Sequence, residues 1–344
     1  MYESFYGLRE RAFDLTPNPR FLLMTPTHRE AIANLQYGML ARKGLTVLIG
    51  EAGSGKTTLV WSVLDEWRKA GHLVSHLNNS ALTRDEFFEY LAGVFDLPPE
   101  AGGSKARFLA EFTRFVTGRH EQGLITGLVI DEAQSLSDEL LEEVRLLVNI
   151  ETASQKLFQV MLVGQPELGS RLNQPGLRQI KQRVALRCTL SPLDLGQVAA
   201  YVAGRLQIAG GVAAQVFTRE AIVSISRHSQ GIPRVISVIC DNVLLAGFAA
   251  GVRPITSATV EEICREFDIR QAVESDEQLF ETTMSRTAAE PRVAPPAVAG
   301  SKDARPEPGP RGAEPHAAGD GSPGGLLQHY IALGKRRLSF FGNG

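Results

Sequence analysis

The stretch that decides the fold is LIGEAGSGKTTL, residues 48–59. It begins as an apolar strand, turns through closely spaced glycines, and ends in a lysine and two threonines. Residues 50–57 fit the phosphate-binding pattern, two glycines five positions apart followed by Lys and Ser or Thr, at every fixed position. Such a loop points successive backbone N–H groups at a phosphate, where the dipole of the following helix favours negative charge. The sequence therefore predicts a nucleotide-phosphate site.

Each position of this loop has an expected role. Gly53 and Gly55 permit close approach of the backbone, Lys56 reaches the two outer phosphates, and Thr57 holds Mg²⁺. The alternative is a chance match in a glycine-containing loop, which the placement between an apolar strand and a helix disfavours. The residues expected to bind the nucleotide are Gly50, Glu51, Ala52, Gly53, Ser54, Gly55, Lys56, Thr57 and Thr58.

A second motif, LVIDEA at 128–133, has two acids at the end of an apolar run. Asp131 is placed to hold the Mg²⁺ shell together with Thr57, as the acidic partner in P-loop enzymes does. Glu132 can polarise a water for in-line attack, which is a general-base role. The alternative leaves Glu132 as a solvated carboxylate. The presence of both acids favours turnover over a passive nucleotide switch.

Phosphoryl transfer also needs positive charge near the transition state. Arg178 and Arg183 lie in LRQIKQRVALR, just before an expected strand, and Arg234 lies in GIPR, at the start of an expected helix. Each of them has the alternative of being a surface cation. Their positions make them candidates.

Strand-like and helix-like patterns alternate over the first 190 residues, which implies a parallel sheet with helices on both faces. From Leu193 onward the strands give way to three or four amphipathic helices, which we interpret as a small helical lid. The fold class expected is therefore α/β. The five expected strands are 46–50, 73–79, 127–133, 158–164 and 184–190.

This division predicts a nucleotide-binding core over 1–190 and a helical lid over 191–272. Residues 273–325 are rich in Pro, Ala and Gly, and we expect a disordered linker because they cannot bury enough apolar surface to fold. Residues 326–344 form an apolar and basic tail. It is either a disordered end or a docking peptide for a membrane-bound partner or the anionic inner leaflet.

Composition narrows the class of protein. The 344 residues carry a formal net charge of -2, which gives no electrostatic footprint for duplex DNA. Three scattered cysteines indicate buried thiols in a reducing cytosol. The most apolar stretch, 235–251, is interrupted by Asp241 and Asn242, so no transmembrane helix is expected.

Several motifs together resemble a known family. The phosphate loop, LVIDEAQ, GQPEL, QRV, LSPL and GIPRVI occur in the order typical of AAA+ ATPases. The more specific parts are GQPEL and the N-terminal block MYESFYGLRERAFDLTPNPRFLLMTPTHREAIANLQYGM, and YVAGRLQIAGG is similar to the family's lid entry. They resemble the general secretion pathway component A (ExeA/GspA) type, and equally the related ATPases of pilus-biogenesis and of exosortase or exopolysaccharide loci. The resemblance covers about residues 1 to 270.

The resemblance implies a P-loop NTPase fold with a five-stranded parallel sheet and a C-terminal helical lid, ATP and Mg²⁺ as cofactors, and assembly into a ring or arc. Gln165 would be a sensor between the phosphate and the acids. Arg183, with Arg178 as the alternative, would be the finger that reaches a neighbour's nucleotide, and Arg234 would be the lid sensor.

The resemblance also implies that the N-terminal segment around Phe13, Pro17 and His28 borders the adenine, although His28 could instead cap the first helix. One departure is Val235-Ile236-Ser237, where the family usually has an asparagine after the hydrophobic pair. Secretion-type members often continue into a transmembrane helix and a peptidoglycan-binding domain. Residues 273–344 offer no counterpart, so wall binding is not expected.

The function expected is that of a cytoplasmic, Mg²⁺-dependent ATPase. It would drive a secretion, pilus or exopolysaccharide/exosortase envelope system through membrane-bound partners, with peripheral membrane contact through 326–344. One alternative is a DNA-transposition ATPase that loads a transposase, which predicts a basic face; the acidic balance and GQPEL count against it. Another is a nucleotide-dependent scaffold without turnover, which Glu132 disfavours.

Overall fold

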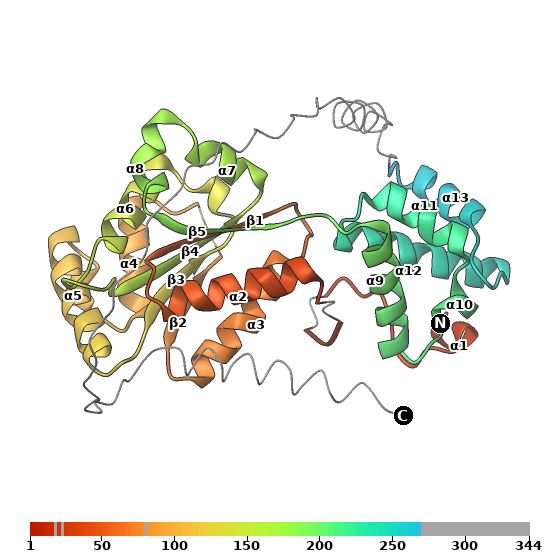
Figure 1. The fold of residues 1–344 in the computed structure, drawn as a ribbon, viewed down its shortest axis with the longest axis horizontal. Coiled ribbons are helices and arrows are strands. Elements are labelled where there is room, and N and C mark those ends of the chain that lie inside the picture. The colour runs from red at the N-terminus through yellow and green to blue at the C-terminus, as the bar shows by residue number, and fades with distance from the viewer. Residues whose placement is uncertain (17–18, 22–23, 79–80, 270–344) are drawn as a thin grey trace, which may run out of the picture. The chain divides into compact units, whose positions relative to one another are not determined.

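The computed structural model describes residues 1–16, 19–21, 24–78 and 81–269, so the expected linker and tail and Pro17 lie outside the described residues. Its centre is a five-stranded sheet in the order β2-β3-β4-β1-β5, with every neighbouring pair parallel (Figure 1). The expectation of five parallel strands in an α/β fold is confirmed. The strands are β1 Leu45–Gly50, β2 Leu73–Leu77, β3 Thr126–Ile130, β4 Phe158–Gly164 and β5 Val184–Leu190.

Two strands end earlier than their apolar patterns suggested. β2 stops at Leu77, and β3 stops at Ile130 rather than continuing through the acids. The physical reason at β3 is local, because Glu132 adopts a left-handed conformation with φ +50°, which breaks the extended backbone. Since all strands are parallel, their carboxyl ends meet at one edge of the sheet, where Gly50, Asp131 and Gln165 emerge.

Helices cover both faces of the sheet (Figure 1). Along β1, Val47 and Ile49 point into one apolar cluster and Leu48 into the other, as the two-residue period of a strand requires. α2 (Pro26–Leu40) and α3 (Lys56–Lys69) pack on the face of Leu48. The opposite face is covered by α4 (Arg84–Val94), α5 (Lys105–Glu121), α6 (Asp138–Val148), α7 (Pro166–Leu172) and α8 (Arg178–Lys181).

Short-range signals account for several helix starts. Thr83 and Glu86 form the expected capping box at α4, and Thr25 caps α2 with Pro26 in its first turn. The helices α7 and α8 were not assigned from the sequence, because both are short. Four 3₁₀ turns complete this half of the chain: η1 Pro19–Phe21, η2 Pro99–Ala101, η3 Ala133–Ser135 and η4 Pro175–Leu177.

A third apolar cluster belongs to the C-terminal helices. It also takes in α1 (Glu3–Tyr6), which is drawn beside α10 in Figure 1, and the residues after it. Tyr6, Leu8 and Phe13 are buried in this cluster. The first thirteen residues thus pack with the helices of the lid, although the sequence grouped them with the core; the domain boundaries themselves stay a prediction. The helices are α9 Leu195–Ile208, α10 Ala213–Val216, α11 Arg219–Ser229, α12 Pro233–Ala250 and α13 Ser257–Glu266.

Among the described residues, α12 is long and apolar enough to cross a membrane by length and composition, with a mean hydropathy of 1.4. Asp241 and Asn242, on which our expectation of no transmembrane helix rested, lie within it. One face of α12 packs within the protein, because it lies against α9, α11 and α13 and buries residues such as Ile239 and Val243 in their cluster. Asp241 accepts a hydrogen bond from the Tyr2 hydroxyl, which binds the polar face of α12 to the N-terminus.

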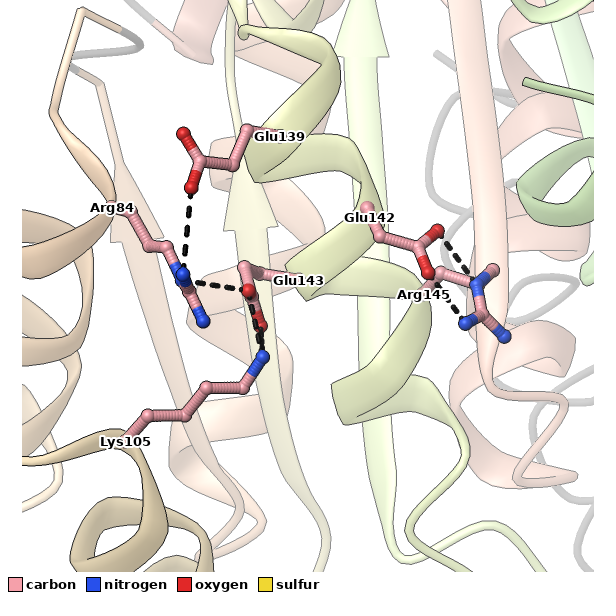
Figure 2. Close-up of polar contacts among 6 residues, drawn as sticks. All are labelled: Arg84, Lys105, Glu139, Glu142, Glu143 and Arg145. Carbon is pink, nitrogen blue, oxygen red and sulfur yellow. Dashed lines mark hydrogen bonds and ion pairs between the residues drawn. The ribbon is translucent and has the colours of Figure 1, made fainter. Parts of the chain in front are cut away.

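A buried carboxylate joins the three helices α4, α5 and α6 (Figure 2). The Glu143 side chain is only 6% exposed, and it pairs with Arg84 Nε at 2.8 Å and with Lys105 Nζ at 2.6 Å. Arg84 Nη1 also lies 3.6 Å from Glu139 Oε1. Two cations, Arg84 and Lys105, therefore compensate the buried negative charge of Glu143, and either of them alone still pairs with it.

This arrangement predicts non-additive effects on stability. Arg84→Ala or Lys105→Ala alone should cost about 1 kcal/mol in the free energy of unfolding, because one cation remains. The double variant should cost about 3 kcal/mol or more, because it leaves the buried carboxylate of Glu143 unpaired. Urea denaturation measures all three.

The control is Glu142→Gln, which breaks the pair with Arg145 shown in Figure 2. Glu142 is 50% exposed, so the cost should stay below about 0.5 kcal/mol. Simple additivity of the Arg84 and Lys105 substitutions would contradict the shared-charge interpretation.

Candidate functional site

The phosphate loop connects β1 to α3 through two glycines that need left-handed backbone conformations. Gly53 has φ +79°, and Gly55, the N-cap of α3, has φ +94°. Any other residue would be strained at these angles. A Cβ at Gly53 would also come within 2.6 Å of Arg234 Cβ, so the loop and the start of α12 approach as closely as glycine allows.

Lys56 lies inside this loop and is 6% exposed. Its Nζ donates to the carbonyl oxygens of Gly50 and Glu51, both at 2.9 Å. Burial lowers the pKa of the ammonium, although nearby carboxylates, Glu132 first among them, oppose this. The Ser54 hydroxyl is buried without a hydrogen-bond partner in the described part of the chain. This Ser54 hydroxyl and the confined Lys56 ammonium are both suited to donate hydrogen bonds to a phosphate.

The residues expected to hold a metal are brought together. Thr57 Oγ1 donates to Asp131 Oδ2 at 2.9 Å, and the Glu132 backbone N–H donates to Asp131 Oδ1 at 2.9 Å. Burial acts to raise the pKa of Asp131, but these bonds and the adjacent His76 outweigh it and lower the pKa. Asp131 is therefore held as a carboxylate at neutral pH.

This hydroxyl and carboxylate fit Mg²⁺, which in phosphate-binding sites takes one or two protein ligands and completes its shell with water and phosphate oxygens. The described residues include no cluster of three or more His, Cys, Asp or Glu side chains that would form an all-protein metal site. His76 Nε2, buried and without a hydrogen-bond partner in the described residues, lies 3.8 Å from Asp131 Oδ2, behind the carboxylate.

The Glu132 carboxylate is held by two amides. Its Oε2 accepts from Gln134 Nε2 at 2.5 Å and from Gln165 Nε2 at 3.1 Å. Gln134 Oε1 also accepts from the Gln165 backbone N–H at 3.1 Å, so the three residues form a closed hydrogen-bond network. Gln165 follows β4 as the N-cap of α7. Sequence reasoning named Glu132 and Gln165 but missed Gln134, although it lies two positions after the glutamate.

A cavity of about 490 Å³ opens beside the loop. Its phosphate end is formed by residues 52–58 and Glu132, whereas Gly50, Glu51, Asp131 and Gln165 do not line it. The remaining wall comes from the N-terminal segment and from the C-terminal helices. These lining residues are Asp14, Leu15, Thr16, Phe21, Thr25, His28, Leu193, Tyr201, Pro233, Arg205, Arg234 and Ser237.

Of the expected adenine neighbours, only His28 is seen to line the cavity. Its Nδ1 lies 2.5 Å from Thr25 Oγ1, and burial lowers its pKa while a hydrogen bond with the Ser54 backbone opposes the shift. Phe13 is wholly buried among the C-terminal helices and does not line the cavity. The Thr-Pro start of α2 was a signal that could have placed Thr25 and His28 together at a helix N-terminus.

The three arginines separate into two groups. Arg234 lines the cavity, and its backbone N–H donates to the Gly53 carbonyl at 3.2 Å. Arg183 and Arg178 are exposed. Arg183 precedes β5, whose first residue pairs with the first residue of β1, so about 20 Å of strand separates it from the loop after Gly50. Neither Arg183 nor Arg178 lines this chain's cavity.

Comparison with known proteins gives two kinds of match. Residues 40–172 match the family model described as AAA domain. The chain is 38% identical over 260 residues to General secretion pathway protein A of Aeromonas hydrophila, an alignment covering 76% of this chain and 47% of that protein. The chain therefore spans about half the length of this curated relative.

Solved structures resemble the fold. The ORC2 protein of Aeropyrum pernix matches with a TM-score of 0.54 and 18% identity, over 78% of this chain and 74% of that one. Cdc6p of Pyrobaculum aerophilum matches with a TM-score of 0.52 and 16% identity, over 80% and 89%. At these identities the likeness concerns the fold alone.

The position of Lys56 in the phosphate loop predicts that removing its ammonium weakens ATP binding. Lys56→Ala should weaken the affinity for ATP about a hundredfold. The ammonium is expected to donate to the two outer phosphates, and the variant loses these two charge-assisted hydrogen bonds of about 1.5 kcal/mol each. Isothermal titration calorimetry measures the affinity. The control is Lys69→Ala at the end of α3, where the side chain is 73% exposed. Equal affinities for the two variants would contradict the role of Lys56.

Proposed function

We propose that this chain, an AAA-domain protein by sequence and fold, is a Mg²⁺-dependent ATPase that drives the assembly or operation of a bacterial secretion, pilus or exopolysaccharide envelope system. The observation that carries the enzymatic part is the convergence of Lys56, the Thr57–Asp131 hydrogen bond and Glu132 at one end of one cavity. The similarity to General secretion pathway protein A supports the envelope role.

The chain's own residues supply binding and proton transfer. Backbone N–H groups of the loop and the Lys56 ammonium neutralise the phosphate oxygens. Mg²⁺, held by Thr57 and Asp131, would neutralise further charge on the phosphates. Together these groups set the terminal phosphate at the Glu132 end of the cavity, where a water can attack in line.

Glu132 is the proposed acceptor of that water's proton. Both amide donors bind its Oε2, and no hydrogen bond from the described residues reaches Oε1. Oε1 is therefore the atom we assign as the base. Gln134 and Gln165 orient the carboxylate, and its placement matters because a displacement of about 1 Å can cost a hundredfold in rate.

The proposal predicts a variant that binds but does not turn over. Glu132→Gln should retain ATP affinity within about threefold, because Glu132 is assigned to the attacking water and the phosphates are assigned to the loop and Lys56. It should lower kcat at least about a hundredfold, the scale of a lost general base. Steady-state phosphate release and equilibrium binding measure the two quantities.

Gln134→Ala is the matched variant for Glu132→Gln. It removes one of the two donors to the carboxylate, so kcat should fall by about tenfold with ATP affinity unchanged. Gln207→Ala on α9, where the side chain is exposed, is the neutral control. An unimpaired kcat in Glu132→Gln would refute the base assignment.

We also propose that the protein works as a homo-oligomer, in a ring or arc, in which Arg183 completes the nucleotide site of a neighbouring copy, with Arg178 as the alternative. The support is distance: about 20 Å of β1 and β5 separates Arg183 from the phosphate loop of its own chain. Arg183 is therefore better placed to act on the nucleotide of a neighbouring copy than on its own. Arg234, which lines the cavity above Gly53, is the proposed sensor from the lid.

Complementation between two inactive variants tests Arg183. Arg183→Ala keeps an intact loop and Lys56→Ala keeps an intact arginine, so a mixed interface can contain one complete site. ATPase activity should reappear on mixing and peak at an intermediate ratio. Arg178→Ala mixed with Lys56→Ala is the matched control for the alternative arginine. The absence of rescue at every ratio would leave Arg183 without a role at a neighbour's site.

The location and the partners follow from this proposal. We propose a cytoplasmic protein that meets membrane-bound secretion or export proteins, with residues 326–344 as a peripheral contact. The support is the sequence of that tail, in which apolar residues precede the basic cluster at 335–337. Basic residues near an anionic membrane surface contribute about 1 kcal/mol each.

A further inference from the structure

Arg205, on α9, is a buried cation that the proposed chemistry does not use. It is 9% exposed and lines the nucleotide cavity. The ion pairs found among the described residues include none with Arg205. A buried arginine is rare unless its donors and its charge are satisfied. The contacts that satisfy this one show what it holds together.

Its guanidinium bridges three segments. Nε donates to the Ala12 carbonyl at 2.7 Å, and Nη2 donates to the Asp14 carbonyl at 3.2 Å. Nη1 donates to Ser237 Oγ on α12 at 3.0 Å and also to the Tyr201 hydroxyl on α9. One side chain thus fastens the N-terminal segment to two of the C-terminal helices.

Aromatic rings surround the same cation. The guanidinium carbon lies 4.9 Å from the ring centre of Phe21, 5.3 Å from that of Tyr201 and 5.9 Å from that of Phe13. Cation–π attraction is worth more at buried sites than at exposed ones, and Arg205 is only 9% exposed. Phe21 belongs to the N-terminal segment and lines the cavity, so these contacts order the cavity wall itself.

The two ends of the cavity depend on this side chain unequally. Asp14, Thr16 and Phe21 line the wall that the N-terminal segment contributes. The phosphate loop is held by β1 and α3 and accepts none of the hydrogen bonds that the Arg205 guanidinium donates to the described residues. Ser237 lies one turn after Arg234, so the contact on α12 has a weaker, indirect link to the phosphate end.

We propose that Arg205 is a positioning residue that holds residues 12–14 and Phe21 against α9 and α12, and that it thereby builds the part of the cavity that recognises the nucleoside rather than the phosphates. This rests on the proposed nucleotide function. Arginine is required because a planar guanidinium with five donors can serve four acceptors at once, whereas the three donors of a lysine ammonium cannot match that geometry.

The experiment compares two ligands that share phosphates and differ in the nucleoside. The affinities of the full chain for ATP and for inorganic tripolyphosphate are measured by calorimetry, in the presence of Mg²⁺. Arg205→Lys should lose at least about tenfold in ATP affinity and keep tripolyphosphate affinity within about twofold, since only the nucleoside wall is disturbed. Arg227→Ala, an exposed arginine on α11, is the control and should change neither.

A second measurement, limited proteolysis with trypsin, reports directly on how firmly the N-terminal segment is held. Trypsin should cleave Arg205→Lys after Arg9, Arg11 or Arg20 faster than it cleaves the unmodified chain, because the N-terminal segment is released. ATP should protect the unmodified chain more than the variant. Unchanged cleavage together with an unchanged ratio of the two affinities would overturn the inference.

If Arg205→Lys fails to fold, the double variant Tyr201→Phe/Ser237→Ala removes two acceptors and keeps the guanidinium. It should lower the ratio of ATP to tripolyphosphate affinity by about threefold, and an unchanged ratio would overturn the inference. Equal losses for both ligands would also overturn it, because Arg205 would then be merely structural. If the unmodified chain bound neither ligand, the proposed function itself would fall.

Discussion

The hydrogen bond from Thr57 Oγ1 to Asp131 Oδ2 is the contact on which the site depends. Thr57 lies in the first turn of α3, after β1, and Asp131 follows β3. These strands are not neighbours, because β4 lies between them. The bond can therefore form only because the strands are parallel and release their carboxyl ends at one edge, the place where open α/β sheets bind ligands.

The same edge explains why a strained residue follows the aspartate. Glu132 has φ +50°, a conformation that costs a non-glycine residue about 1 to 3 kcal/mol and persists only where the surroundings impose it. The surroundings here are the amides of Gln134 and Gln165, which hold the carboxylate at the mouth of the cavity. Both amides donate to Oε2, so the hydrogen bonds of the described residues leave Oε1 without a donor, as our proposal for Glu132 requires.

The other half of the cavity has a different origin. The sheet edge supplies the phosphate end, but the remaining wall comes from the N-terminal segment and the C-terminal helices, which share one apolar cluster. Phe13 is buried in that cluster, and Arg205 ties the backbone beside it to α9 and α12. The first residues of the chain thus belong, by packing, with its last described helices. That association places the N-terminal wall and Arg234 on one cavity.

The sequence by itself determined the parts of this protein that depend on short-range chemistry. The five strands follow from apolar runs, and the phosphate loop follows from Gly53 and Gly55, whose left-handed angles few other residues tolerate. Asp131 and Glu132 were placed because they end such a run. The tertiary structure alone decided the strand order, the partnership of Gln134 with Glu132, and the burial of Arg205. The reason is physical: Arg205 and Ala12 lie 193 positions apart, and a hydrogen bond between them leaves no periodic or compositional trace along the chain.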